Sequence, residues 1–191
     1  MSLKNVVQVE LGRRKHLAGW TLGEQVFEEG LRSAASSLRP QQVLLLSFRD
    51  VEFATGSFFK ATWLRLREDS ENWVPVVVGH LTEEVRHEFE VFLLGLRLPG
   101  LEATDWGEAG IEHAKLHGQM ESTSQRALMA LLNTPGATAP ELERLSGESL
   151  SPTAWTNRLQ ELHRNGLAFR EKAGRAWRFS PVAKRIEVSH G

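Results

Sequence analysis

Short polar side chains and cations are concentrated in one helix expected near the end of this 191-residue chain. Ser151-Pro152 predicts its start, because a capping residue precedes a proline at the first helical position, and Gly166 predicts its end. Trp155 belongs to the apolar side as a core anchor. On the other side, polar groups could hydrogen-bond to base edges of duplex DNA and arginines could reach its phosphates. The base-edge candidates are Thr153, Thr156, Asn157 and Gln160, and the phosphate candidates are Arg158 and Arg164.

A basic β-hairpin is expected directly after this helix. Residues 167–172 and 175–180 are β-prone arms around Ala173-Gly174, a suitable hairpin turn. The apolar residues Phe169, Trp177 and Phe179 are expected to cover the helices. Cations on the arms would neutralise phosphates in a salt-sensitive manner; the alternative is a solvated hairpin edge protected by charge. These cations are Arg170, Lys172, Arg175 and Arg178.

Two more helices are expected before the polar one. The first covers residues 123–133, and the second starts at Thr138-Ala139-Pro140-Glu141 and ends at Gly147. The stretch from Thr123 to about Ser180, above all the segment 159–170 (LQELHRNGLAFR), resembles a MarR-type winged helix. The resemblance implies an α+β winged helix-turn-helix domain whose third helix binds DNA. Winged helices also serve as protein-interaction modules, so the fold alone leaves both functions open.

Strands and helices alternate in the first half of the chain. Strands are expected over residues 5–11, 42–48, 73–79 and 101–106, and helices over residues 23–38, 58–67 and from Thr82 onward. Because parallel neighbours require long crossovers, this order predicts a small α/β layer with helices packed on a sheet.

The run 44–59 (LLLSFRDVEFATGSFF) resembles the core of STAS-like domains, and the resemblance covers about residues 4–106. In related anti-sigma-factor antagonists, an Asp followed by a phosphorylatable Ser begins the helix here and contacts a kinase-like or sigma-regulator partner. This chain instead has Thr55, Gly56 and Ser57. Thr55 and Ser57 are therefore candidate regulatory hydroxyls, because a helix N-terminus favours added phosphate; the alternative is a simple helix cap.

The segment between the two resemblances is predicted to be a linker. Residues 107–122 contain glycines at 107, 110 and 118, with a short helix expected over residues 111–116. The predicted domains are a STAS-like domain over residues 1–106 and a winged-helix domain over residues 123–191.

The two halves of the chain differ in charge. Residues 1–119 contain 13 Lys/Arg and 17 Asp/Glu, and residues 120–191 contain 10 Lys/Arg and 7 Asp/Glu, which gives formal charges of −4 and +3. This asymmetry favours nucleic-acid contact by the second half.

Several classes of function are disfavoured by composition and motifs. The chain has no cysteine, which removes disulfides and thiolate metal sites, and it carries no glycine-rich phosphate loop or nucleophile elbow. His113 and His117 have a metal-compatible spacing but no evident third ligand. We therefore expect a protein that is not an enzyme and that binds no cofactor or metal. With no expected export signal or membrane span, a cytoplasmic protein is predicted.

Two functions follow from this reading. The first is a transcriptional regulator that binds duplex DNA through the winged helix under control of the STAS-like domain. Such a DNA-binding regulator is expected to form a dimer, because simultaneous binding to two half-sites of the DNA multiplies the effect of weak individual contacts. The alternative is a partner-switching adaptor in which both domains bind protein and no DNA is bound.

Overall fold

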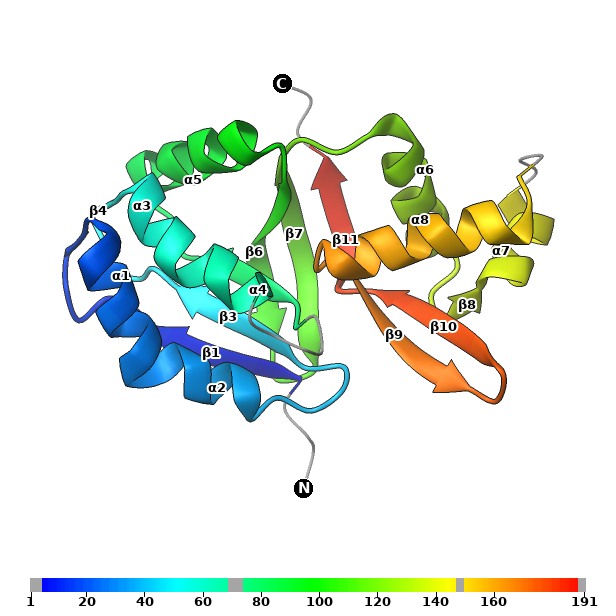
Figure 1. The fold of residues 1–191 in the computed structure, drawn as a ribbon, viewed down its shortest axis with the longest axis horizontal. Coiled ribbons are helices and arrows are strands. Elements are labelled where there is room, and N and C mark those ends of the chain that lie inside the picture. The colour runs from blue at the N-terminus through cyan, green and yellow to red at the C-terminus, as the bar shows by residue number, and fades with distance from the viewer. Residues whose placement is uncertain (1–4, 69–73, 147–149, 189–191) are drawn as a thin grey trace.

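A six-stranded mixed sheet forms the centre of the molecule (Figure 1). The computed structural model describes residues 5–68, 74–146 and 150–188. The strand order is β1-β3-β5-β6-β7-β11, in which only the β6–β7 pair is antiparallel. The strands are β1 (Val6–Glu10), β3 (Val43–Ser47), β5 (Val76–Gly79), β6 (Pro99–Gly107), β7 (Gly110–Gly118) and β11 (Ala183–Val188).

Helices from the first half of the chain cover one face of this sheet. They enclose an apolar cluster that includes Leu44, Leu46, Val76 and Val78 of the sheet. Thr82 caps the longest helix by accepting a hydrogen bond from Val85 N, as its position before an acidic first turn predicts. The helical segments are α1 (Trp20–Val26), the π-helical turn η1 (Phe27–Leu31), α2 (Arg32–Ser36), α3 (Gly56–Phe59), the π-helical turn η2 (Lys60–Leu64), α4 (Arg65–Glu68) and α5 (Glu83–Leu96).

A three-helix unit with a β-hairpin lies against the other face. Sheet residues such as Leu45, Leu101 and Leu116 belong to the same apolar cluster as Leu128 and Trp155 of this unit. Its small sheet has the order β8-β10-β9, and a separate ribbon pairs β2 (His16–Leu17) with β4 (Phe53–Ala54). The elements are α6 (Ser122–Asn133), β8 (Ala137–Thr138), α7 (Ala139–Ser146), α8 (Pro152–Arg164), β9 (Ala168–Ala173) and β10 (Ala176–Pro181).

The predicted strands and helices of both halves are present, with end shifts of a few residues. The helix expected over residues 23–38 begins earlier, at Trp20. Gly147, which was expected to end the second C-terminal helix, and Trp73, which was expected to begin a strand, lie outside the described residues.

The sequence predicts a linker over residues 107–122 with a short helix over residues 111–116. This prediction is wrong for residues 110–118, which form strand β7. Gly107 pairs with Gly110 across the turn of the β6–β7 hairpin, and Gly118 lies at the strand's end with φ 81°. These glycines are therefore turn residues of a strand pair, although their density suggested a flexible connection. Ile111, Ala114 and Leu116 are buried, and because Ile111 and Ala114 are three positions apart, the period of two that marks a strand is not evident in the sequence.

The two halves are joined by more than one connection. After the hairpin, β11 returns to the central sheet and pairs with β7 in parallel. The buried guanidinium of Arg67 donates to Pro99 O at 3.2 Å and to Arg164 O and Asn165 Oδ1 at 3.3 Å, and burial lowers its pKa to about 10. The end of α4 is thereby bound to the end of α8.

Candidate nucleic-acid interface

Helix α8 has one side in the core and one side in solvent. Ser151 caps it by accepting a hydrogen bond from Ala154 N at 3.2 Å, and Pro152 occupies the first turn. Trp155, Leu159 and Leu162 are fully buried. Among the predicted DNA contacts, Thr153, Asn157 and Arg164 are exposed, and Thr156, Arg158 and Gln160 are half-buried.

Two of the predicted α8 contacts have interactions within the protein. Thr156 Oγ1 donates to Pro152 O at 2.9 Å, so its hydroxyl hydrogen serves the helix backbone. The Arg158 guanidinium carbon lies 6.0 Å from the centre of the Trp155 ring. Thr153, Asn157 and Gln160 therefore remain the groups best placed to meet base edges.

The hairpin β9–β10 forms the wing that the sequence predicts. Ala173 pairs with Ala176 across the turn, where Gly174 has φ 63°, a left-handed conformation that suits glycine. Lys172 and Arg175 are exposed near this tip. Within the described part of the chain, neither side chain forms an ion pair, so both cations can approach an external phosphate.

The other two wing arginines are held by neighbours. Arg178 Nη1 donates to Gly136 O at 2.6 Å, and Nη2 lies 3.5 Å from Glu141 Oε1. Arg170 lies over the Trp177 ring, with its guanidinium carbon 4.5 Å from the ring centre. Arg178 therefore links the wing to the turn before β8 and to α7, a role that its strand position did not reveal.

Of the three apolar wing residues expected to cover the helices, Phe179 is buried and Phe169 packs partly buried against the same core. Trp177 does not cover them, because it is 40% exposed. The register explains the difference: Trp177 lies towards the tip opposite Lys172, whereas Phe179 pairs with Ala137 of β8 beside the helices.

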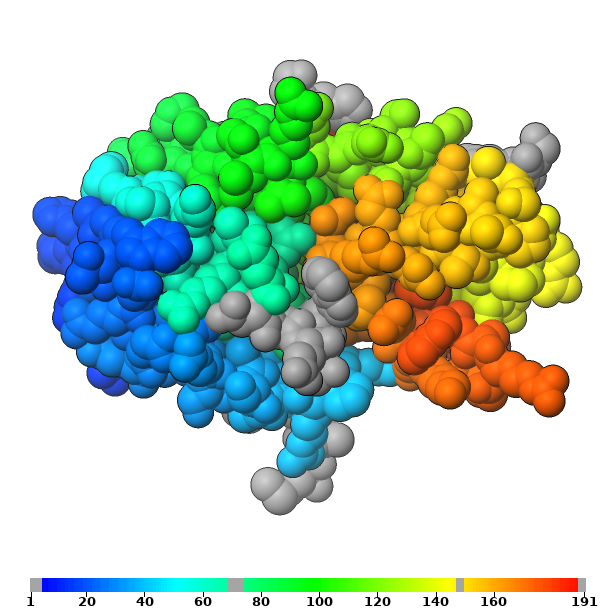
Figure 2. All heavy atoms as spheres, viewed as in Figure 1, coloured from blue at the N-terminus to red at the C-terminus, as the bar shows by residue number. Residues whose placement is uncertain are grey.

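Acidic residues in this region are engaged inside the protein. On α8, Glu161 Oε2 accepts a hydrogen bond from Ser124 Oγ of α6 at 3.0 Å. On β9, Glu171 accepts one from the Gln41 side chain in the first half of the chain. In Figure 2, the yellow-orange atoms of α8 and the orange-red atoms of the wing share one face. Helix α8 and the wing are therefore accessible from the same side of the molecule.

The candidate hydroxyls lie at the start of α3, far from α8 in Figure 1. Thr55 Oγ1 accepts hydrogen bonds from Phe58 N at 3.3 Å and Gly19 N at 3.0 Å, and it lies 3.0 Å from Ser57 Oγ. Thr55 is thus a half-buried helix cap, whereas Ser57 is exposed. Of the two, only Ser57 offers a hydroxyl on the surface.

The histidine pair considered for metal does not assemble a site. His117 is buried, with Nδ1 2.8 Å from Glu90 Oε1 and Nε2 2.8 Å from Glu102 Oε2, whereas His113 Nε2 lies 3.4 Å from Arg185 Nη1. Among the described residues, no group of three or more His, Cys, Asp or Glu side chains is arranged to hold a metal ion.

Sequence reasoning missed the residues that connect the two halves. Arg67 and Gln41 were assigned no role, and each contacts a partner about 100 or more positions later, since the pairs Arg67–Arg164 and Gln41–Glu171 are 97 and 130 residues apart. No local pattern marks such contacts.

No protein-family model, curated protein or solved structure matches this chain. None of the described helices is long and apolar enough to cross a membrane.

Proposed function

We propose that this protein is a cytoplasmic transcriptional regulator that binds duplex DNA through α8 and the β9–β10 wing. The observation that carries the proposal is that α8, with its exposed polar residues Thr153 and Asn157, and the wing, with its exposed cations Lys172 and Arg175, are both visible on one face of the molecule (Figure 2). The carboxylates of Glu161 and Glu171 accept hydrogen bonds from Ser124 and Gln41, and among the described residues neither forms an ion pair with Lys172 or Arg175. The winged-helix resemblance of the sequence points the same way.

In this proposal α8 enters the major groove. Asn157 and Gln160 are suited to adenine, whose N7 and N6 groups match an amide, and Thr153 can meet a thymine methyl group. Arg164, Lys172 and Arg175 contact flanking phosphates and fix the register without specifying sequence. A dimer would place two such helices on successive half-sites.

The first half of the chain is the regulatory part in this proposal. Because its sheet shares an apolar core with α6 and α8, and because β11 at the edge of that sheet directly follows the wing strand β10 in the chain, a signal would reach the wing through packed contacts. Arg67 supplies one such contact, between α4 and the end of α8.

Fluorescence anisotropy with a labelled random-sequence duplex tests DNA binding. The wild type is titrated between about 50 and 200 mM salt, where neutralised phosphates make affinity fall steeply. The variant Lys172→Ala/Arg175→Ala should weaken binding and reduce the salt slope by about 2, at about 0.9 per lost contact. Arg178→Ala is avoided because Arg178 bonds Gly136.

The control is Arg13→Ala/Arg14→Ala, which removes two exposed cations from the first half of the chain and should leave the affinity unchanged. Absence of binding at the lowest salt would rule out the DNA proposal. Equal losses in both double variants would show that only net charge matters.

One observation favours the adaptor as a second candidate function. Trp20 and Phe53 are 43% and 39% exposed, and both adjoin the α3 start where Gly19 N bonds Thr55 Oγ1. Exposed aromatic residues are enriched in protein interfaces. If DNA binding is absent and a protein complex is lost on Trp20→Ala, the adaptor is supported.

A further inference from the structure

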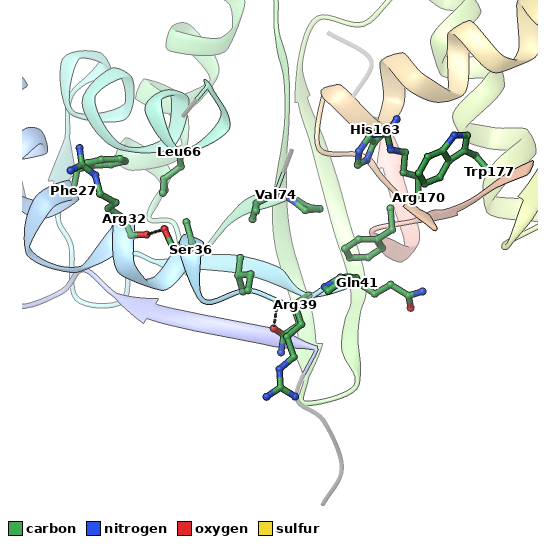
Figure 3. Close-up of a pocket in the computed structure, with 16 residues that line it drawn as sticks. Phe27, Arg32, Ser36, Arg39, Gln41, Leu66, Val74, His163, Arg170 and Trp177 are labelled. Atoms are coloured by element: carbon green, nitrogen blue, oxygen red, sulfur yellow. Dashed lines mark hydrogen bonds between the residues drawn. The ribbon is translucent and has the colours of Figure 1, made fainter. Parts of the chain in front are cut away.

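A groove of about 640 Å³ separates the wing from the first half of the chain (Figure 3). One wall comes from α2, the segment that leads to β3, and the residues before β5. The other wall comes from the end of α8 and the two wing strands. The volume is within the range of small-molecule sites, about 300–1,000 Å³.

The charged side chains that line the groove are all cationic. Arg32, Arg39 and Arg170 line it, and its described lining contains no Asp or Glu. Arg32 is compensated by Glu28, with Nη2 2.7 Å from Oε1. Arg39 lies at the rim and extends outward, and Arg170 lies between His163 and Trp177 (Figure 3). These two arginines favour an anionic ligand.

His163 places a hydrogen-bond acceptor in the groove wall. The residue is only 7% exposed, and Nδ1 lies 2.9 Å from Ala168 O. Because a carbonyl only accepts, Nδ1 carries the proton. Burial lowers the pKa of His163, as do Arg170 and Arg164, despite the opposing bond to Ala168. The neutral ring thus leaves Nε2 as an acceptor, with no partner among the described residues.

Aromatic surface lies next to this acceptor. Trp177 and Phe169 both line the groove, and Trp177 keeps 40% of its surface exposed with Arg170 stacked on the ring. Aromatic rings and arginine planes are stacking platforms for nucleobases. An acceptor, a stacking platform and two cations within one groove match an amino-bearing base with an attached phosphate.

We propose that this groove binds a purine nucleotide, with the base against Phe169 and the Arg170 plane that is stacked on Trp177, its amino group near His163, and its phosphate towards Arg39. Nucleotide binding itself does not depend on the proposed DNA function. Its regulatory consequence does rest on that function: the ligand would contact Arg170 and thereby change how the wing meets phosphates.

Isothermal titration calorimetry of the full chain with adenosine monophosphate, without DNA, tests the site. Adenosine, which lacks the phosphate, and ribose 5-phosphate, which lacks the base, serve as ligand controls. Trp177→Ala should raise the dissociation constant about tenfold, the loss expected for one stacked base, because Arg170 loses the ring on which it is stacked. Arg39→Ala should also weaken binding, and its exposed position at the rim keeps the fold intact.

Trp20→Ala and Arg13→Ala are matched controls, because they remove an exposed tryptophan and an exposed arginine outside the groove. The proposal is supported if adenosine monophosphate binds with a dissociation constant below about 1 mM, more tightly than either fragment, and only the groove variants weaken it. It is overturned if no heat of binding appears, if either fragment binds equally well, or if Trp177→Ala has no effect. DNA anisotropy, measured separately, shows independently whether the proposed function fails.

Discussion

At the scale of single residues, the most constrained group is the buried carboxylate of Glu102. Arg86 donates to it through Nε and Nη2, both at 2.8 Å, and His117 Nε2 lies 2.8 Å from Oε2. Burial would raise the pKa of Glu102, but the hydrogen bonds from His117 and Arg86 outweigh burial and lower it from 4.5 to about 2. The ionised form is therefore strongly favoured in the folded protein.

We predict that Glu102→Gln lowers the free energy of unfolding by about 3 kcal/mol at neutral pH, because it leaves Arg86 and His117 without their charged acceptor. A depressed carboxyl pKa stabilises the fold fully above about 4.5, and this stabilisation is lost as pH falls towards 2. Urea unfolding at pH 7 and pH 3 should show the difference between wild type and variant shrinking at the lower pH. The exposed Glu187→Gln is the control; a pH-independent difference would contradict the assignment.

At the scale of elements, α8 depends on its first turn for position. Ser151 Oγ accepts from Ala154 N, and the helix then carries Trp155 into the core and Asn157 into solvent. The cap fixes where the helix starts and hence which residues face outward.

We expect Ser151→Ala to reduce the free energy of unfolding by about 1 kcal/mol, because the first-turn amides lose an acceptor. Thr153 is exposed and lies two positions later, and Thr153→Ala should change the free energy of unfolding by less than about 0.5 kcal/mol. Urea denaturation measures both. Equal effects of the two variants would show that the cap contributes little.

At the scale of the whole molecule, the two halves are joined through a shared core. The sheet and the three-helix unit share an apolar cluster, β11 pairs with β7, and Arg67 binds the end of α8. Independent domains on a linker would have no such shared core.

A single unfolding transition is therefore expected. Trp63 lies in the helical layer over the first face and Trp155 in the C-terminal unit, and both are buried. With fluorinated tryptophan, the NMR signals of these two residues should vanish at the same urea concentration. Separate midpoints would indicate two domains that unfold independently.

The sequence by itself determined the local elements, because their signals are local. Thr82 and Ser151 marked helix starts through short-range capping, and the run Val43-Leu44-Leu45-Leu46 marked a buried strand. The polar side of α8 and the cationic wing were likewise evident from spacing within about thirty residues, so most of the candidate DNA surface could be predicted.

Only the tertiary structure decided how these elements combine. It turned the expected linker into β7, brought β11 back to the sheet, and engaged Arg178 with Gly136. The groove also exists only because residues 27–42 and 163–177 face each other. Each of these features depends on contacts between residues far apart in the chain, whose energies come from shared burial and pairing. Hydrophobic periodicity and helix-capping residues depend only on neighbours a few positions away in the chain, so they do not predict such contacts.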